Sequence, residues 1–150
     1  MLSPTDPAMR AFLRSTRIVE VATLSPKRRP FVTPLWFVVD GGALYLTTGP
    51  ETWAARNIAR QPEVTLLFDE ERGGRSDRVL RLHGTATRHR GLPSWCVLLR
   101  VAAKYYVSPR ALPLEVRNAR RWRLRRLLYG QGGFGYLRVL PTAGELLPRP

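Results

Sequence analysis

The sequence predicts an α+β domain in which an antiparallel sheet, closing into a small barrel, is flanked by helices. Three observations support this fold class. Apolar and β-branched residues alternate along several short segments, as half-buried strands require. Turns at Ser25–Pro30 and Asp40–Gly42 return the chain as hairpins. Apolar residues recur at helical spacing over a long segment only after Leu92.

The length of 150 residues fits one domain with a substantial core. We expect four parts within it: an N-terminal helix in residues 1–16, the barrel core in 17–90, a helical pair with an Arg-rich face in 92–129, and a closing strand in 133–140. The strands are expected at Arg17–Leu24, Phe31–Asp40, Ala43–Thr48, Glu63–Asp69, Arg78–Arg90 and Phe134–Leu140.

Three helices follow from periodicity and punctuation. The first, Pro4–Ser15, would bury Met9, Phe12 and Leu13. A short inserted helix would begin at Gly49-Pro50-Glu51, with Pro and an acid in its first turn, and end at Gln61-Pro62. The third would reach about Tyr106 and carry apolar residues at helical spacing, which are Trp95, Leu98, Leu99, Ala102 and Tyr105 or Tyr106.

A fourth helix is expected from Ser108-Pro109 to about Tyr129, with an arginine cluster, Arg117–Arg126, on its outer face. The segment Glu70–Asp77 is expected to be a mobile surface loop, and the last ten residues, PTAGELLPRP, a trailing edge.

The charge is strongly basic, with 25 Lys and Arg against 11 Asp and Glu, a formal net of +14. It is uneven: residues up to Gly91 carry 14 basic and 9 acidic side chains (+5), and the rest carry 11 and 2 (+9). Such a surface attracts phosphates, nucleic acid or polyacidic molecules. A solvated Arg-rich surface, due to coding bias, is the alternative interpretation.

Other compositional features narrow the function classes. A single cysteine, Cys96, excludes an internal disulfide and a multi-cysteine metal site, and we expect no metal. No signal peptide or membrane span is visible, which predicts a cytoplasmic protein. The two histidines, His83 and His89, are read as surface or barrel residues, so no catalytic residue is assigned.

The stretch from Pro30 to Pro62 is the candidate site. Two strands deliver the chain to a helix N-terminus, where backbone N–H groups can receive an anion. Pro34 lies in the middle of the first strand and cannot donate to the ladder, so one side of that strand must be unpaired, bulged or open there. An open edge offers backbone groups to a ligand.

The succession ATLS, RRPFVTPLWFVVDGGALYLTTGPETWAARNIARQPEVTLLFDE and VLRLHGTAT resembles the pyridoxamine 5'-phosphate oxidase-like, FMN-binding split-barrel superfamily. It is nearer to the actinobacterial branch of flavin- and deazaflavin-dependent oxidoreductases. The resemblance covers about Ile18 to Arg90. It implies a six-stranded split β-barrel that forms a homodimer with two cofactor sites at the interface.

The resemblance also implies which segments hold the cofactor, either FMN or the deazaflavin coenzyme F-420. The strand matching Val32–Phe37 would lie against the ring, and Thr47–Asn57 would receive the phosphate. The expected cofactor-binding residues are Thr33, Pro34, Leu35, Trp36, Thr47, Thr48, Gly49, Thr52, Trp53, Arg56 and Asn57.

The sequence departs from the family at the phosphate clamp. Members commonly carry a basic pair where this chain has Trp53-Ala54, and the strand positions that can hold phosphate-binding Arg and Lys are Val32 and Phe37. Arg56 is the nearest replacement, with Arg60 one turn further along.

Two functions therefore stand at the level of the sequence. The first is an oxidoreductase that transfers a hydride between a flavin-type cofactor and a small organic substrate; the Arg117–Arg126 cluster would suit the polyglutamate tail of F-420. The alternative is a cofactor-poor split barrel whose basic helix binds nucleic acid or another acidic partner. A haem-handling split barrel has only the two histidines in its favour.

Overall fold

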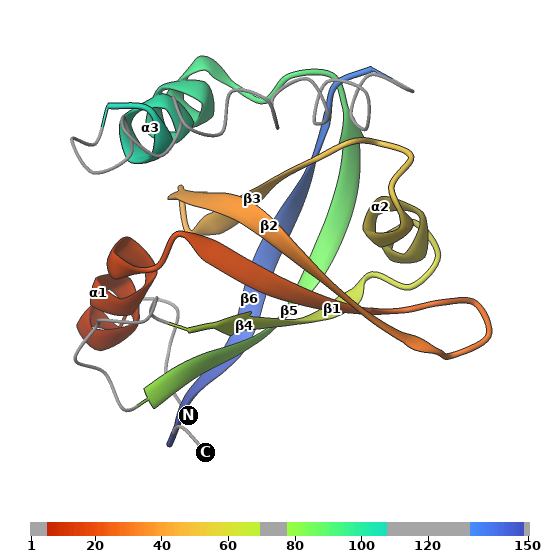
Figure 1. The fold of residues 1–150 in the computed structure, drawn as a ribbon, viewed down its shortest axis with the longest axis horizontal. Coiled ribbons are helices and arrows are strands. Elements are labelled where there is room, and N and C mark those ends of the chain that lie inside the picture. The colour runs from red at the N-terminus through yellow and green to blue at the C-terminus, as the bar shows by residue number, and fades with distance from the viewer. Residues whose placement is uncertain (1–5, 70–77, 108–132, 149–150) are drawn as a thin grey trace, which may run out of the picture.

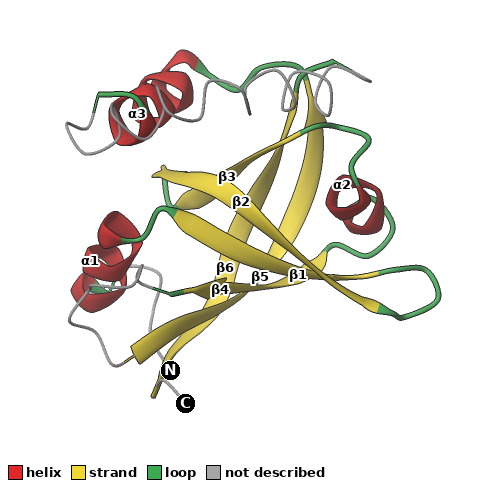
Figure 2. Cartoon of the chain, viewed as in Figure 1, coloured by secondary structure: helices red, strands yellow, loops and turns green. Residues whose placement is uncertain are grey.

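The six strands close into an antiparallel barrel in the order β1-β2-β3-β6-β5-β4 (Figure 1). The coordinates are a computed structural model, which describes residues 6–69, 78–107 and 133–148. The strands are β1 (Ile18–Leu24), β2 (Pro30–Asp40), β3 (Ala43–Thr48), β4 (Glu63–Phe68), β5 (Arg78–Arg90) and β6 (Gly135–Pro148), and the helices are α1 (Pro7–Ser15), α2 (Trp53–Ile58) and α3 (Trp95–Tyr105). The predicted α+β split barrel is confirmed. Figure 2 shows α1 and α3 on one side of it and α2 on the other.

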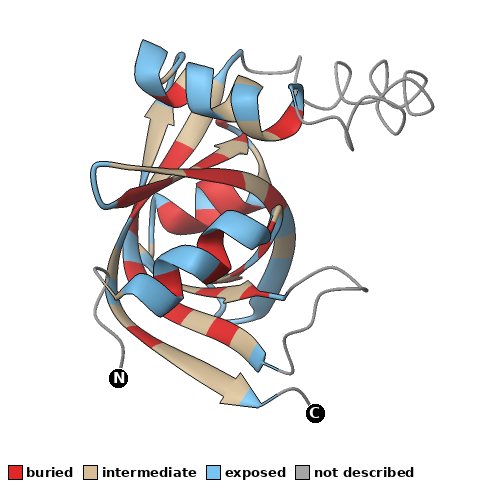
Figure 3. Cartoon of the chain, turned by 90° about the vertical axis from the view of Figure 1, so that its left-hand side faces the viewer, coloured by how far each residue is buried: buried red, intermediate tan, exposed pale blue. Residues whose placement is uncertain are grey.

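The barrel interior is filled by one face of every strand. On the described strands, ten side chains have no exposed surface: Val19, Val21, Phe37, Leu46, Leu66, Phe68, Leu80, Leu82, Leu137 and Val139. The rings of Phe37 and Phe68 meet edge to face, with centroids 4.9 Å apart. Helix α1 contributes the buried Met9, Phe12 and Leu13 to the same core, as its periodicity predicted. The buried bands on strands and helices are visible in Figure 3.

Strand β6 is longer than predicted. The segment Pro141–Pro148 is not a trailing edge, because β6 pairs with β5 along its whole length, from Gly135 opposite Arg90 to Pro148 opposite Arg78. A register shift between His83 and Gly84 accommodates Pro141, and proline is tolerated in a sheet at such a bulge. The Thr142 hydroxyl donates to the His83 carbonyl there, at 3.2 Å.

Helix α2 begins later and ends earlier than predicted. Its N-cap is Thr52, whose hydroxyl accepts from the Ala55 N–H, and its C-cap is Ala59. Its first turn holds no acidic residue. The difference arises because Gly49–Glu51 forms the turn that leads out of β3, and a Thr side chain caps a helix better than that turn can.

Helix α3 packs along a face that only partly coincides with the predicted one, since Tyr105 is buried as expected but Trp95 and Leu99 are not. Trp95 and Leu99 are 79% and 65% exposed. The helix instead packs through Val97, Val101 and Tyr105, an i, i+4, i+8 row. This row faces β2 and β3, where it forms a second apolar cluster with Trp36, Val38 and Tyr45.

The predicted loop Glu70–Asp77, the fourth helix and the Arg117–Arg126 cluster lie outside the described residues. Within the described ranges, no helix combines the length and apolar character needed to cross a membrane.

Replacing Gly84 with alanine is expected to lower the free energy of unfolding by about 1–3 kcal/mol, the usual cost of overpacking. A Cβ at this position would lie 2.7 Å from the Leu140 carbonyl oxygen, a backbone atom that the bulge holds in place. Urea unfolding measures the change. The neighbouring exposed Thr85→Ala is the control, with a change within about 0.5 kcal/mol; equal midpoints for the two variants would contradict this account of the bulge.

Candidate functional site

A pocket of about 500 Å³ lies between the β2–β3 sheet, the start of β6 and helix α3. Its volume falls in the range of small-molecule sites. The described residues around it are almost all apolar or aromatic, and none of these carries a charge: Ile18, Pro34, Leu35, Trp36, Tyr45, Leu46, Thr47, Thr48, Gly49, Leu92, Pro93, Val97, Leu98, Val101, Tyr106, Gly133, Phe134, Gly135 and Tyr136. Such a lining favours a neutral, planar ligand portion.

One edge of β2 is open where it borders the pocket. Along Pro30–Leu35 this strand pairs with β1 alone, because pairing with β3 begins only at Trp36 opposite Thr47. Backbone groups alternate in direction along a strand. The N–H and C=O of Phe37 point toward the β1 side, because both are bonded by the Tyr105 hydroxyl, which also donates to the Arg17 carbonyl just before β1. The backbone of Val32 and Pro34 therefore faces the open side. The predicted opening at Pro34 is present.

Trp36 is held in place by two tyrosines of the α3 region. Its ring stacks on Tyr105 with centroids 4.5 Å apart and planes 8° apart, and Tyr106 meets it edge-on at 6.2 Å. Tyr106 also lines the pocket. The sequence predicted that Tyr105 or Tyr106 would lie on the apolar face of the helix; Tyr105 is the one that packs there, and Tyr106 lines the pocket.

The Tyr105 hydroxyl occupies the place where the ladder between β1 and β2 would continue. It accepts a hydrogen bond from the Phe37 N–H at 2.9 Å, and its proton is shared between the Arg17 carbonyl at 2.5 Å and the Phe37 carbonyl at 2.9 Å. Burial raises the pKa of Tyr105 to about 12, although the Phe37 backbone bond and the Arg17 charge act in the opposite direction. The hydroxyl thus joins β1, β2 and α3 at one point beside the pocket.

Six of the eleven predicted cofactor residues line the pocket: Pro34, Leu35, Trp36, Thr47, Thr48 and Gly49. The Thr48 and Thr52 hydroxyls are 3.0 Å apart, and Thr52 also donates to the Gly49 carbonyl at 3.1 Å. These bonds fix the turn that closes one end of the pocket. Thr52 is occupied as the cap of α2, so its hydroxyl has local partners.

The other predicted residues, Thr33, Thr52, Trp53, Arg56 and Asn57, do not line this pocket. The Asn57 amide is buried and donates to the Thr23 hydroxyl at 3.1 Å. Trp53 is 61% exposed and stacks on Phe31, with centroids 6.0 Å apart. The Arg56 guanidinium lies 4.2 Å from the centre of the Trp53 ring. An exposed pair of stacked rings, Phe31 and Trp53, with the Arg56 guanidinium on the Trp53 ring, therefore lies at the start of β2.

Sequence reasoning missed the contributions of α3 and β6 to the pocket. Val97 and Val101 were overlooked because the helical face was assigned through the larger Trp95 and Leu99. Tyr136 lies directly opposite Thr47 in the ladder, a pairing that depends on which distant strand closes the barrel. The alternation of Tyr136, Arg138 and Leu140 with Leu137 and Val139 was the available signal.

Basic side chains lie near the turn after β3 but outside the pocket lining. Arg88 of β5 donates to the Pro50 carbonyl at 3.3 Å and is half-buried. Arg90 forms an ion pair with Glu51. Arg88 therefore brings a positive charge to the Gly49–Thr52 turn, which the sequence did not indicate because 38 residues separate Arg88 from Pro50.

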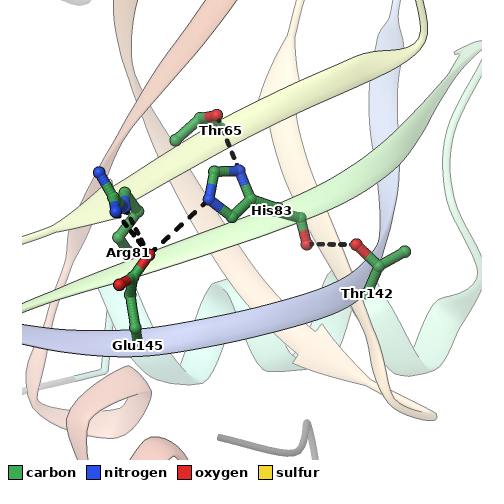
Figure 4. A network of polar contacts seen from close by, with 5 residues as sticks. All are labelled: Thr65, Arg81, His83, Thr142 and Glu145. Carbon is green, nitrogen blue, oxygen red and sulfur yellow. Dashed lines mark hydrogen bonds and ion pairs between the residues drawn. The ribbon is translucent and has the colours of Figure 1, made fainter. Parts of the chain in front are cut away.

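The two histidines are accounted for by surface contacts. His83 projects from the outer face of β5, where its Nδ1 lies 3.1 Å from the Thr65 hydroxyl and its Nε2 4.0 Å from Glu145 (Figure 4). Glu145 is bonded more closely by Arg81, at 2.6 Å. His89 stacks on Tyr136 at 4.8 Å behind the pocket wall. Among the described residues, no cluster of three His, Cys, Asp or Glu side chains could hold a metal ion.

The family is decided by a match along most of the chain. The family model described as pyridoxamine 5'-phosphate oxidase matches residues 5–123. The chain belongs to the pyridoxamine 5'-phosphate oxidase family. No curated protein matches it.

Several solved structures share this fold at low sequence identity. An F-420 reductase is 20% identical with a TM-score of 0.62, covering 91% of this chain and 94% of its own. A pyridoxamine 5'-phosphate oxidase-related, FMN-binding protein of Nostoc punctiforme is 19% identical with a TM-score of 0.63, covering 98% and 85%. HutZ, a heme storage protein of Vibrio cholerae, is 17% identical with a TM-score of 0.60, covering 95% and 93%. Proteins that share this fold are therefore named for different ligands, which are F-420, FMN and heme.

Replacing Tyr105 with phenylalanine is expected to destabilise the protein by about 1–3 kcal/mol near neutral pH, because the Phe37 N–H loses its partner. Because the pKa of Tyr105 is raised, the destabilisation should also depend on pH. A folded-state pKa of about 12, above the ordinary tyrosine pKa of 10.0, contributes stability below about pH 10 that is lost as pH rises toward 12. The difference in unfolding free energy between native and variant proteins should therefore shrink over that interval.

Thermal and urea unfolding from pH 7 to 12 measure this difference. Tyr45→Phe is the matched control, since no hydrogen bond of the Tyr45 hydroxyl is found in the described part of the chain and only its ring contacts Tyr136. A difference that stays constant with pH, or a loss as large in the control, would rule out the bridging role.

Proposed function

We propose that the protein is a flavin- or deazaflavin-dependent oxidoreductase whose cofactor ring occupies the pocket beside the open edge of β2. The observation that carries this proposal is an aromatic pocket of about 500 Å³, to which the residues that the structure describes contribute no charged side chain and beside which strand β2 pairs with only one of the described strands. A planar ring with polar edges fits both properties. The family match and the two redox-named neighbours support the assignment.

The residues present fit the ring better than they fit the phosphate. Trp36 and Tyr106 would face or wall the ring, and the backbone of Val32 and Pro34 would bind its polar edge. The turn from Thr47 to Thr52 would lie toward the phosphate, with Arg88 and Arg56 as the nearest cations in place of the family's basic pair. When bound, the cofactor would accept or donate the hydride; the protein's part is to orient the ring and exclude water.

The substrate end of the site would be apolar. Leu98, Val101 and Phe134 lie along the α3 and β6 sides of the pocket, so a small neutral organic substrate is favoured over an anion. The polyglutamate tail of F-420 would extend to the Arg117–Arg126 cluster, and affinity that is insensitive to tail length and to salt would remove that part of the proposal.

The first experiment is to examine the purified protein for a flavin-type absorption spectrum and then to titrate it with FMN and with F-420. Bound ring should quench tryptophan fluorescence because Trp36 lines the pocket. Arg56→Gln and Arg88→Gln should each weaken binding roughly ten- to a hundredfold, the worth of one charge-assisted hydrogen bond. Arg60→Gln, an exposed arginine beyond the end of α2, is the control.

The absence of saturable quenching by either cofactor would overturn the proposal. In that case the second function, a cofactor-poor split barrel that binds an acidic partner, would be tested by the salt dependence of nucleic-acid binding. Equal losses in the three arginine variants would leave the ring site intact but remove the phosphate assignment.

The proposal includes a homodimer in which a second copy covers the open edge. Support comes from the exposure of three large hydrophobic side chains, since Phe31, Val32 and Trp53 are 37%, 59% and 61% exposed. Trp53→Glu should therefore shift the molar mass measured by light scattering from dimer toward monomer. Trp95→Glu, at an even more exposed tryptophan on α3, should leave the mass unchanged; a monomeric native protein at micromolar concentration would refute the dimer.

A further inference from the structure

A second cleft, of about 710 Å³, lies along a row of α3 next to the one that lines the aromatic pocket. It is bounded by α1, by the turn between β2 and β3, and by α3, three segments that lie on the same side of the barrel in Figure 1. The two cavities share no lining residue. An inference about this cleft therefore does not rest on the proposed function.

The charge of the cleft is one-sided. Four basic side chains, Arg10, Arg14, Arg100 and Lys104, line it against one acid, Asp40. Asp40 is already paired with Arg100, at 2.8 Å. Among the described residues, no ion pair includes Arg10, Arg14 or Lys104. Within the described part of the chain, three cations without an acidic partner thus face one cavity from two helices.

Lys104 differs from an ordinary surface lysine. Its ammonium lies 3.6 Å from the centre of the buried Phe37 ring and 3.4 Å from the Leu13 carbonyl near the end of α1. A carbonyl at a helix C-terminus and an aromatic face both favour a cation, but neither supplies a full negative charge. Burial, and secondly the charge of Arg17, lower the pKa of Lys104 to about 8. Among the described residues, the Lys104 ammonium therefore has no negatively charged partner.

We propose that this cleft is a binding site for a small phosphate-bearing molecule. Arg10 and Arg14 are one helical turn apart, so their guanidinium groups can approach two oxygens of one phosphate from the α1 side. Lys104 supplies the third positive charge from α3. The apolar walls, which include Met9, Leu13, Val38 and Leu44, would hold the non-phosphate part of the ligand. A walled cleft of this kind favours a small molecule over an extended nucleic acid.

The chain offers a direct test because it contains only two lysines, Lys27 and Lys104. Lys27 lies in the exposed turn between β1 and β2, away from the cleft, and serves as an internal reference. Amine acetylation in short pulses at pH 7.5, followed by peptide mass spectrometry, reports on both side chains in one sample. Inorganic pyrophosphate is the probe, with sodium chloride at matched ionic strength as the salt control.

Pyrophosphate should slow acetylation of Lys104 in a saturable way and leave Lys27 unchanged, because a bound anion both covers the amine and favours its protonated form. Arg14→Gln should raise the pyrophosphate concentration for half protection about tenfold or more, the loss expected for one charge-assisted hydrogen bond. Arg14 is exposed, so this variant should keep the native unfolding temperature. Arg60→Gln, on the other side of the barrel, should leave half protection where it is.

Three results would overturn the proposal. They are equal protection of Lys27 and Lys104, protection reproduced by sodium chloride alone, and half protection that is the same in Arg14→Gln as in the native chain. A failure here would leave the flavin-type proposal standing, since pyrophosphate protection and ring-induced tryptophan quenching report on cavities with separate linings.

Discussion

The arrangement of the site depends on the point at which the β1–β2 ladder ends and the Tyr105 hydroxyl takes its place. A ladder that simply stopped there would leave the backbone groups of Phe37 and the Arg17 carbonyl unpaired beside the core, which is costly. One phenol oxygen meets all three groups and, because Tyr105 belongs to α3, it also docks that helix on β2. The same ring stacks on Trp36. The hydrogen bonds that satisfy the backbone at the end of the β1–β2 ladder therefore also hold Trp36, which forms one wall of the pocket.

The barrel was predictable because its signals are local. Alternation gave the strands, and the Asp40-Gly41-Gly42 turn fixed the β2–β3 hairpin, where both glycines adopt positive φ. The errors occurred where long-range pairing overrode a local signal. Pro141 reads as the end of a strand, but β5 continues beside it and a bulge absorbs it. Thr52 lies too close to the proline of Gly49–Glu51 for the sequence alone to show which of them begins α2.

The site was predictable to the extent that it lies on the β2–β3 hairpin and the turn after it. These residues are continuous in sequence, and a proline inside an apolar strand indicates an open edge wherever the strand is placed. The wall made by α3 depends on which face of an apolar helix is buried. Trp95 and Leu99 are larger than Val97 and Val101, so size pointed to the wrong row. Arg88 reaches the Pro50 turn only because β5 and β6 pair, and no local pattern reveals that.

Helix α3 separates two environments of opposite chemistry. Its Val97 and Val101 row faces an aromatic pocket, while Arg100 and Lys104, on the neighbouring row, face the cleft. Among the described lining residues, the pocket has no charged side chain and the cleft has an excess of basic ones. A helix that packed on both sides would bury these cations in the core at a high desolvation cost. Because α3 contacts the barrel along one row only, its second face stays at the surface of the cleft, where the cations remain partly hydrated. The exception is Lys104, whose ammonium contacts both the Leu13 carbonyl of α1 and the Phe37 ring. The Phe37 ring also packs against Phe68 in the barrel core. Phe37 therefore contacts both the Lys104 ammonium in the cleft and the side chains of the barrel interior.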